Sequence, residues 1–212
     1  MSARRVASSA LIAALAVIPA VGCGSSSTGA SGAAASTPST LATASGGAAD
    51  PNAPEVNAAG DIPDNQVYVA WAPPGGGWSV KVPEGWARTD ATGGAVFTDK
   101  YNSIGARAAA TALAPTVDSA QSNDVPAIRA SAVKVSDVKV SAVTRTAGTA
   151  VLVTYTADSP PNDVTGKSVR IAVERYQFFR NGTEVVLTLS GPVGADNVDP
   201  WKTIANSFGW AT

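Results

Sequence analysis

Residues 167–190, KSVRIAVERYQFFRNGTEVVLTLS, hold the strongest structural pattern of this 212-residue chain. Two runs rich in β-branched and aromatic residues flank Asn181-Gly182, and this pair is the strongest short-range indication of a two-residue β-hairpin. Residues 167–180 and 183–190 are therefore expected to form two long antiparallel strands joined by a tight turn.

Side chains alternate between the two faces of a strand, and the first strand of this hairpin changes its apolar face halfway. Ile171 and Val173 lie on one face, whereas Tyr176 and Phe178 fall on the other. A β-bulge near residues 174–175 would bring these side chains to one face. Alternatively, both faces of the strand are covered.

The region beyond residue 63 contains further strand patterns joined by short turns, so neighbouring strands are expected to be antiparallel. These patterns cover residues 78–82, 95–98, 104–113, 133–145 and 150–156. Helices are expected over 119–132, with Pro126 in the first turn, and after Asp199, which has the character of an N-cap. The expected fold class is α+β, a mainly antiparallel sheet flanked by helices.

The amino terminus has the pattern of an export signal, which we place at residues 1–22. Arg4 and Arg5 precede the apolar stretch Ala10–Pro19. That stretch is too short to cross a hydrocarbon core of about 30 Å, which favours a signal peptide over a membrane span.

The sequence AVGC at residues 20–23 resembles a lipobox, with alanine at a position where leucine is usual. The resemblance implies transfer of a diacylglyceryl group to the thiol of Cys23, cleavage before it, and anchoring at the extracytoplasmic face of the cell membrane. Two alternatives stay open. The segment could be an ordinary secretory signal with an incidental cysteine, and Arg4-Arg5 could direct twin-arginine export.

A low-complexity linker follows the cysteine. From Gly24 to Ala49 every residue except Leu41 is Gly, Ala, Ser, Thr or Pro. Such a segment buries too little apolar surface to offset its ordering entropy, so we expect residues 23–63 to be a disordered stalk. A flexible coil of about 40 residues has a root-mean-square reach of ~30–40 Å. The folded domain is expected at residues 64–212.

Composition excludes several classes of function. Cys23 is the only cysteine and histidine is absent, which removes disulfides within the chain, the usual general base and the commonest metal ligand. Residues 64–212 carry 13 Lys plus Arg and 13 Asp plus Glu, so no basic surface for nucleic acid is expected. The acidic segment 196–199 fails the EF-hand spacing and is interpreted as a loop and helix cap. We expect no metal, no cofactor and a monomer.

Two stretches resemble PsbP/Mog1-like domains. They are WSVKVPEGW at residues 78–86 with the following Val96–Asp99, and a terminal helix ending in Ser207-Phe208. The resemblance covers residues 71–210. This group includes photosystem extrinsic subunits, a Ran-binding protein and actinobacterial lipoproteins such as the LpqN group, and the lipobox favours the last of these. No catalytic residue carries over, so the resemblance implies a non-enzymatic binding or accessory role.

The aromatic residues are the best candidates for a binding site. We expect a groove for an apolar ligand or partner, flanked by the loops at residues 73–77 and 159–163. Its candidate lining residues are Trp71, Trp78, Trp86, Tyr176 and Phe178. The alternative interpretation of the same residues is packing in the core and turns.

Together these patterns predict a membrane-anchored accessory lipoprotein of the cell envelope that binds a protein partner or an apolar or lipid ligand, without catalysis. One alternative is a histidine-free hydrolase, which would need two carboxylates converging in a concave pocket. The other is a purely structural envelope component, with which no partner would co-purify.

Substitution of Cys23 tests the anchor. Cys23→Ala removes the thiol that would be acylated, so the domain should be released into the medium or remain unprocessed. Fractionation of cells and mass measurement of the amino terminus check this. Membrane retention of a normally processed variant would refute the lipid anchor.

Overall fold

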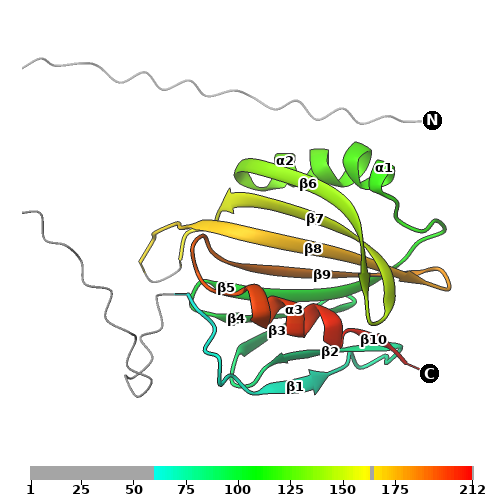
Figure 1. Ribbon diagram of the computed structural model, residues 1–212, viewed down its shortest axis with the longest axis horizontal. Helices are drawn as coiled ribbons and strands as arrows, with labels where there is room; N and C mark the ends of the chain where they lie inside the picture. Colours follow the sequence, from blue (N-terminus) through cyan, green and yellow to red (C-terminus); the bar gives the residue numbers. More distant parts are fainter. Residues whose placement is uncertain (1–59, 163–164, 212) are drawn as a thin grey trace, which may run out of the picture. The chain divides into compact units, whose positions relative to one another are not determined.

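The computed structural model describes residues 60–162 and 165–211 (Figure 1). The expected signal peptide, Cys23 and all but the last residues of the expected linker lie outside this part of the chain. Within it, no helix is long and apolar enough to cross a membrane. Antiparallel sheets and a few helices make up the described residues, so the expected α+β class is confirmed.

Seven strands form the main sheet in the order β3-β4-β5-β9-β8-β7-β6, and every neighbouring pair is antiparallel. Their bounds are β3 Ala87–Ala91, β4 Gly94–Asp99, β5 Asn102–Ala110, β6 Val133–Arg145, β7 Gly148–Asp158, β8 Arg170–Arg180 and β9 Thr183–Pro192. The central strand is β9, with β8 beside it. The hairpin that the sequence indicates most strongly is therefore the middle of the sheet.

One face of this sheet packs against a second layer (Figure 1). That layer is a small sheet in the order β1-β2-β10, together with the last helix. Its elements are β1 Tyr68–Trp71, β2 Trp78–Pro83, β10 Gly209–Trp210 and α3 Val198–Ser207. Side chains from β2, β4, β5, β8, β9 and α3 are buried between the layers and form the main core.

The opposite face is covered over β6, β7 and β8 by the consecutive segments α1 Val117–Ser119, η1 Ala120–Asp124 and α2 Val125–Ser131. A smaller core lies there, in which Ala120, Val151 and Val153 are buried against half-buried Val125 and Ile128. These helical segments contact β6, and among residues 60–162 and 165–211 no other helix lies over the same face of β3, β4, β5 and β9 (Figure 1).

The turn between β8 and β9 is the one expected. Asn181 has φ 50° and Gly182 has φ 76°, and a type I′ turn requires positive φ at both positions. The pairing runs without a shift from Arg180 opposite Thr183 to the far end of the hairpin. The β-bulge considered near residues 174–175 is therefore absent from this pair.

Both faces of β8 are covered instead. Tyr176 and Phe178 point into the main core, and both are 1% exposed. Val173 and Arg175 lie on the other face, where Arg175 contacts Asp124 of η1 at 3.4 Å. The register irregularities of the sheet lie in β6, between Val133 and Lys139.

Pro126 lies in the first turn of α2, so its expected place is confirmed, but the helical run does not start there. The helical segment begins earlier, after Thr116, whose side chain accepts a hydrogen bond from the Ser119 amide in a capping box. Proline has no N–H and cannot continue a regular α-helical ladder. The π-helical turn η1 precedes the proline, and in it the Val125 amide donates a hydrogen bond to the carbonyl of Ala120. The helix is therefore wider just before the proline and continues after it.

The expected N-cap Asp199 is wrong, because α3 begins at Val198 after Asn197. The buried side chain of Asn197 accepts a hydrogen bond from the Ile62 amide (2.8 Å) and donates to the carbonyl of Gly60 (3.0 Å). This asparagine holds the beginning of the described chain against α3. Ile62 is 3% exposed in the main core, although the expected linker extends to residue 63.

The hairpin turn is tested by Gly182→Val. A β-branched residue at φ 76° is strained, which should lower the free energy of unfolding by roughly 1–3 kcal/mol. Thermal unfolding of the full chain measures the loss. Gly105→Val is the matched control, since Gly105 lies in β5 without positive φ and its added Cβ would sit 4.0 Å from its nearest neighbours. Equal melting temperatures for the two variants would contradict the tight turn.

Candidate functional site

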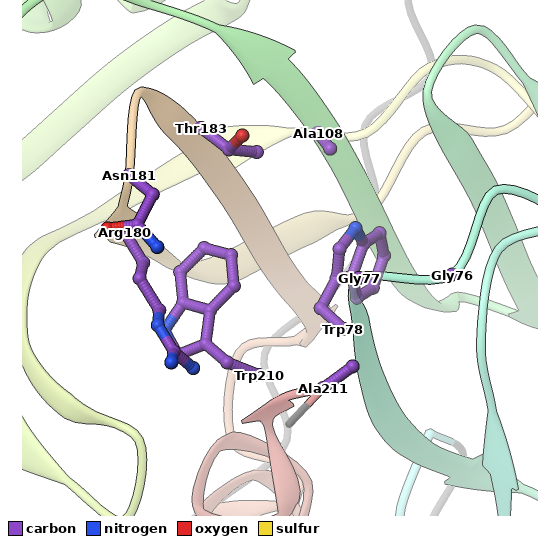
Figure 2. A pocket seen from close by; sticks show the side chains of 9 residues that line it. All are labelled: Gly76, Gly77, Trp78, Ala108, Arg180, Asn181, Thr183, Trp210 and Ala211. Carbon is purple, nitrogen blue, oxygen red and sulfur yellow. The ribbon is translucent and has the colours of Figure 1, made fainter.

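The strand pair β2–β10 places two indoles beside a hollow at the hairpin end of the domain. Trp210 lies directly opposite Trp78 in the antiparallel register, and side chains in such positions share a face of the sheet. Together with the β8–β9 turn they line a hollow of about 470 Å³, shown in Figure 2. This volume lies within the range of small-molecule sites. We call it the indole hollow.

A glycine loop forms the open side of the indole hollow. Gly76 and Gly77 have φ of 67° and 87°, which favours glycine, and a Cβ added to either would have no atom within 4 Å. The Gly77 carbonyl accepts a hydrogen bond from the Ala211 amide at 3.0 Å, which ties the loop to the carboxyl-terminal strand. The backbone here is held in place while no side chain obstructs the entrance.

A second hollow of about 480 Å³ adjoins the first around the same loop. The two share Gly76, Trp78 and Ala108, and the second extends past Pro73 toward the β3–β4 turn. The loop at residues 73–77, one of the two loops expected to flank a groove, therefore borders both hollows, and Trp78 lines both of them.

Polar groups lie on one side of the indole hollow. Arg180, Asn181 and Thr183 come from the β8–β9 turn and face the indoles (Figure 2). Arg180 is exposed and forms no ion pair among the described residues. The lining combines apolar indole surface with a cation and hydrogen-bonding groups, which suits a ligand with an apolar body and a polar or anionic end.

The five expected lining residues do not line one groove together in the structure. Trp78 lines both hollows, with only 3% of its surface exposed. Trp71 and Trp86 are half-buried against the main core, while Tyr176 and Phe178 lie inside it.

An aromatic chain connects the buried residues to the hollow. Phe178 stacks on Phe208 with ring centres 4.1 Å apart, and Phe208 meets Trp210 edge to face at 5.3 Å. Trp71 similarly contacts Trp78 edge to face at 5.5 Å. The expected residues Phe178 and Trp71 thus support the indoles from behind rather than line the hollow.

Sequence reasoning missed Trp210 and Arg180 as lining residues. Arg180 precedes the predicted turn, so its position at the hairpin tip could have been predicted from the sequence. The pairing of Trp210 with Trp78 could not have been predicted, because a two-residue strand has no periodicity.

The second expected flanking loop lies elsewhere. Ser159, Pro160 and Pro161 line hollows of about 450 and 400 Å³, the smaller of which also contains Ser190 near the end of β9. The indole hollow contains Thr183, at the start of β9. The two loops therefore lie at opposite ends of the same strand, and Asp163 lies outside the described residues.

Carboxylates are sparse around the hollows. Among the described residues, each of these two pairs of hollows contains one carboxylate, Asp90 at one end and Asp158 at the other. Both belong to ion pairs, Asp90 with Arg88 and Asp158 with Lys134. The same part of the chain contains no group of three metal-binding side chains.

Behind the aromatic chain, Tyr176 joins a buried polar group. Its hydroxyl donates a hydrogen bond to Glu174 at 2.6 Å and accepts one from Arg145 at 3.0 Å. The Arg145 guanidinium also lies 5.0 Å from the centre of the Tyr176 ring. Burial, with the Glu174 hydrogen bond second, raises the pKa of Tyr176 to about 12.

No protein-family model matches the chain, and neither does any curated protein. Two solved structures are similar to it. Cyanobacterial PsbP (CyanoP) from Synechocystis sp. PCC 6803 is 14% identical, with a TM-score of 0.45 over 72% of this chain and 98% of that one. LpqN, involved in cell envelope biogenesis of Mycobacterium tuberculosis, is 15% identical, with a TM-score of 0.42 over 70% of this chain and 93% of that one. The expected resemblance to these two groups is thus found among solved structures, at values that carry no argument about function.

Tyr176→Phe tests the buried polar group. Loss of the hydroxyl leaves Glu174 and Arg145 without this partner and should lower the free energy of unfolding by about 1–3 kcal/mol at neutral pH. Because the folded pKa lies above the unfolded value of 10.0, this contribution is complete below pH 10 and is lost as pH rises through about 12. Thermal unfolding and absorbance titration measure both effects.

Tyr101→Phe is the control, since the Tyr101 hydroxyl has no hydrogen bond within the described chain. Equal destabilisation by the two substitutions, or ionisation of Tyr176 near pH 10, would contradict this account.

Proposed function

We propose that this chain is a membrane-anchored accessory lipoprotein of the cell envelope that binds a lipid-like ligand in the indole hollow, without catalysis. The ligand has an apolar body that lies against Trp78 and Trp210 and a polar or anionic end that meets Arg180. The membrane is reached through a lipid on Cys23, at the extracytoplasmic face.

The pairing of Trp210 with Trp78 beside an unpaired arginine is the observation that carries this proposal. Edge-to-face contacts with Phe208 and Trp71 hold the two indoles, so the hollow does not depend on a ligand to form it. A preformed apolar wall reduces the ordering cost of binding. The cation at its side gives an amphipathic ligand one orientation.

The anchor and the linker fit the same function. A domain at the end of a flexible chain with a reach of ~30–40 Å stays close to the membrane and can meet lipid-derived molecules there. One acyl chain anchors a protein only marginally, and the diacylglyceryl group implied for Cys23 supplies two.

Binding of myristate to the full-length Cys23→Ala chain tests the proposal, because the carboxylate and alkyl chain of myristate have the two required parts. Trp210→Ala removes half of the indole wall, and burial of an aromatic side chain stabilises by ~1.5–3 kcal/mol, so the dissociation constant should rise about tenfold or more. Titration calorimetry measures the affinity, and thermal unfolding confirms that the variant folds.

Trp86→Ala is the matched control, since Trp86 is half-buried but lines neither hollow. A further comparison uses myristyl alcohol: Arg180→Gln should weaken binding of myristate and leave that of the alcohol unchanged. The proposal fails if myristate does not bind, or if Trp86→Ala weakens binding as much as Trp210→Ala.

A further inference from the structure

The part of the main sheet that no described helix covers contains a further hollow of about 530 Å³, which shares only Ala108 with the indole hollow. It lies on the face that α1, η1 and α2 leave free, opposite the face that packs against α3. Its lining includes Arg107, Arg175, Ser103, Thr188 and Gly105, and no carboxylate. We call it the arginine trough.

Strand register brings the two arginines to the same trough. Arg175 on β8 is opposite Thr188 on β9, and Thr188 is in turn opposite Gly105 on β5. Arg107 lies two residues further along β5, on the same face. With strands ~4.8 Å apart and a rise of ~3.3 Å per residue, the two Cα atoms are about 12 Å apart, so both long side chains can reach a group above Thr188.

The floor between them is formed by Gly105 on β5 and by Val186 and Thr188 on β9. Gly105 presents only backbone, and a Cβ added there would lie 4.0 Å from both Thr188 and Val96. Ala109 and Ser103 extend the floor along β5. This face of the sheet is therefore hollowed between Arg107 on one side and Arg175 on the other.

The two arginines on this face differ in how many of their polar groups have partners. Asp124 of η1 lies 3.4 Å from Arg175 and also accepts a hydrogen bond from Gln177, as does Glu184. Asp124 lies on the helix side of the face, whereas Glu184 lies on β9 opposite Ala109, at one end of the trough. The Nε of Arg175 is buried without a hydrogen-bond partner.

Arg107, by contrast, is exposed and has no ion pair or hydrogen bond within the described residues. Guanidinium groups are suited to bidentate recognition of oxyanions. Two guanidinium groups on different strands, with the Ser103 and Thr188 hydroxyls below, can donate from several directions, which suits a tetrahedral anion better than a planar one.

We propose that the arginine trough binds a phosphoryl group, with Arg107 as the principal cation and Arg175, held by Asp124, as the second. The source is a phospholipid head group or a soluble phosphate, which present the same chemistry. This site is independent of the indole hollow, so either can fail without the other.

Titration of the full-length Cys23→Ala chain with inorganic phosphate tests the site. Amide resonances at Gly105 and Arg107, and the Arg175 Nε–H, should move in NMR spectra. Arg107→Gln should weaken binding about tenfold or more, because hydrogen bonds to charged groups are strong, and binding should fall with added salt. Arg129→Gln is the matched control, an exposed arginine on α2 outside the trough.

Gly105→Val gives a test that does not depend on charge. Valine suits a strand position, so the fold should be kept while the new side chain fills the floor, and phosphate affinity should fall about tenfold. Thermal unfolding of all variants verifies that they fold.

Vesicles distinguish the two sources. A lipid head group is supported if the same chain sediments with vesicles that contain phosphatidylglycerol and not with phosphatidylcholine vesicles. This sedimentation should be lost in Arg107→Gln and kept in Arg129→Gln. The result supports the lipid source even where free phosphate has no effect. Localised shifts with free phosphate, lost in the same variant, support a soluble source. The proposal is overturned if neither probe binds, or if Arg107→Gln and Arg129→Gln behave alike with both.

Discussion

The register of the β8–β9 hairpin is the constraint on which the rest of the structure depends. A two-residue turn with positive φ at both positions permits one alignment of the strands, and a slip of one residue would exchange every side chain between the faces. Because β9 is the central strand, this alignment places Leu187 and Leu189 in the main core. The hairpin thus determines which face of the sheet receives α3.

The same register determines where binding surfaces form. One layer covers one face of the sheet and a short helical run covers part of the other, so β4, β5 and β9 keep one free face. The arginine trough lies on that face, between Arg107 and Arg175. The indole hollow lies where the hairpin tip meets the carboxyl-terminal strand, so Arg180 and Trp210 come together from segments distant in sequence. Two surfaces of different chemistry thus follow from one arrangement of strands.

Much of the sheet could be predicted from the sequence, because apolar residues alternate in β2 and β6, short apolar runs mark β4 and β7, and the Asn181-Gly182 turn is unambiguous. Strands β3 and β10 could not, since β3 is the exposed sequence ARTDA and β10 has two residues. The π-helical turn η1 before Pro126 was missed because such a turn has no sequence periodicity of its own. Asn197 was missed as the cap residue because its side chain is used in a tertiary contact with Gly60.

The site was only partly predictable for a similar reason. Large aromatic residues mark cores and binding sites equally, and Tyr176, Phe178 and Trp78 were assigned to one groove. The burial of Tyr176 and Phe178 in the main core follows from the alternation of β8 once the register is known. The pairing of Trp78 with Trp210 depends instead on a contact between β2 and the distant strand β10. Contacts between segments that are distant in sequence therefore decide which aromatic residues line the hollow and which pack behind it.

The central claim is that the indole hollow is a preformed ligand site, and the indole N–H resonances of the five tryptophans test it most directly. NMR spectra of the full-length Cys23→Ala chain, labelled with nitrogen-15 at tryptophan, would be recorded with and without myristate. The account predicts that Trp78 and Trp210 shift while Trp86 stays in place. Fixed signals for Trp78 and Trp210, or a shift of Trp86 equal to theirs, would contradict it.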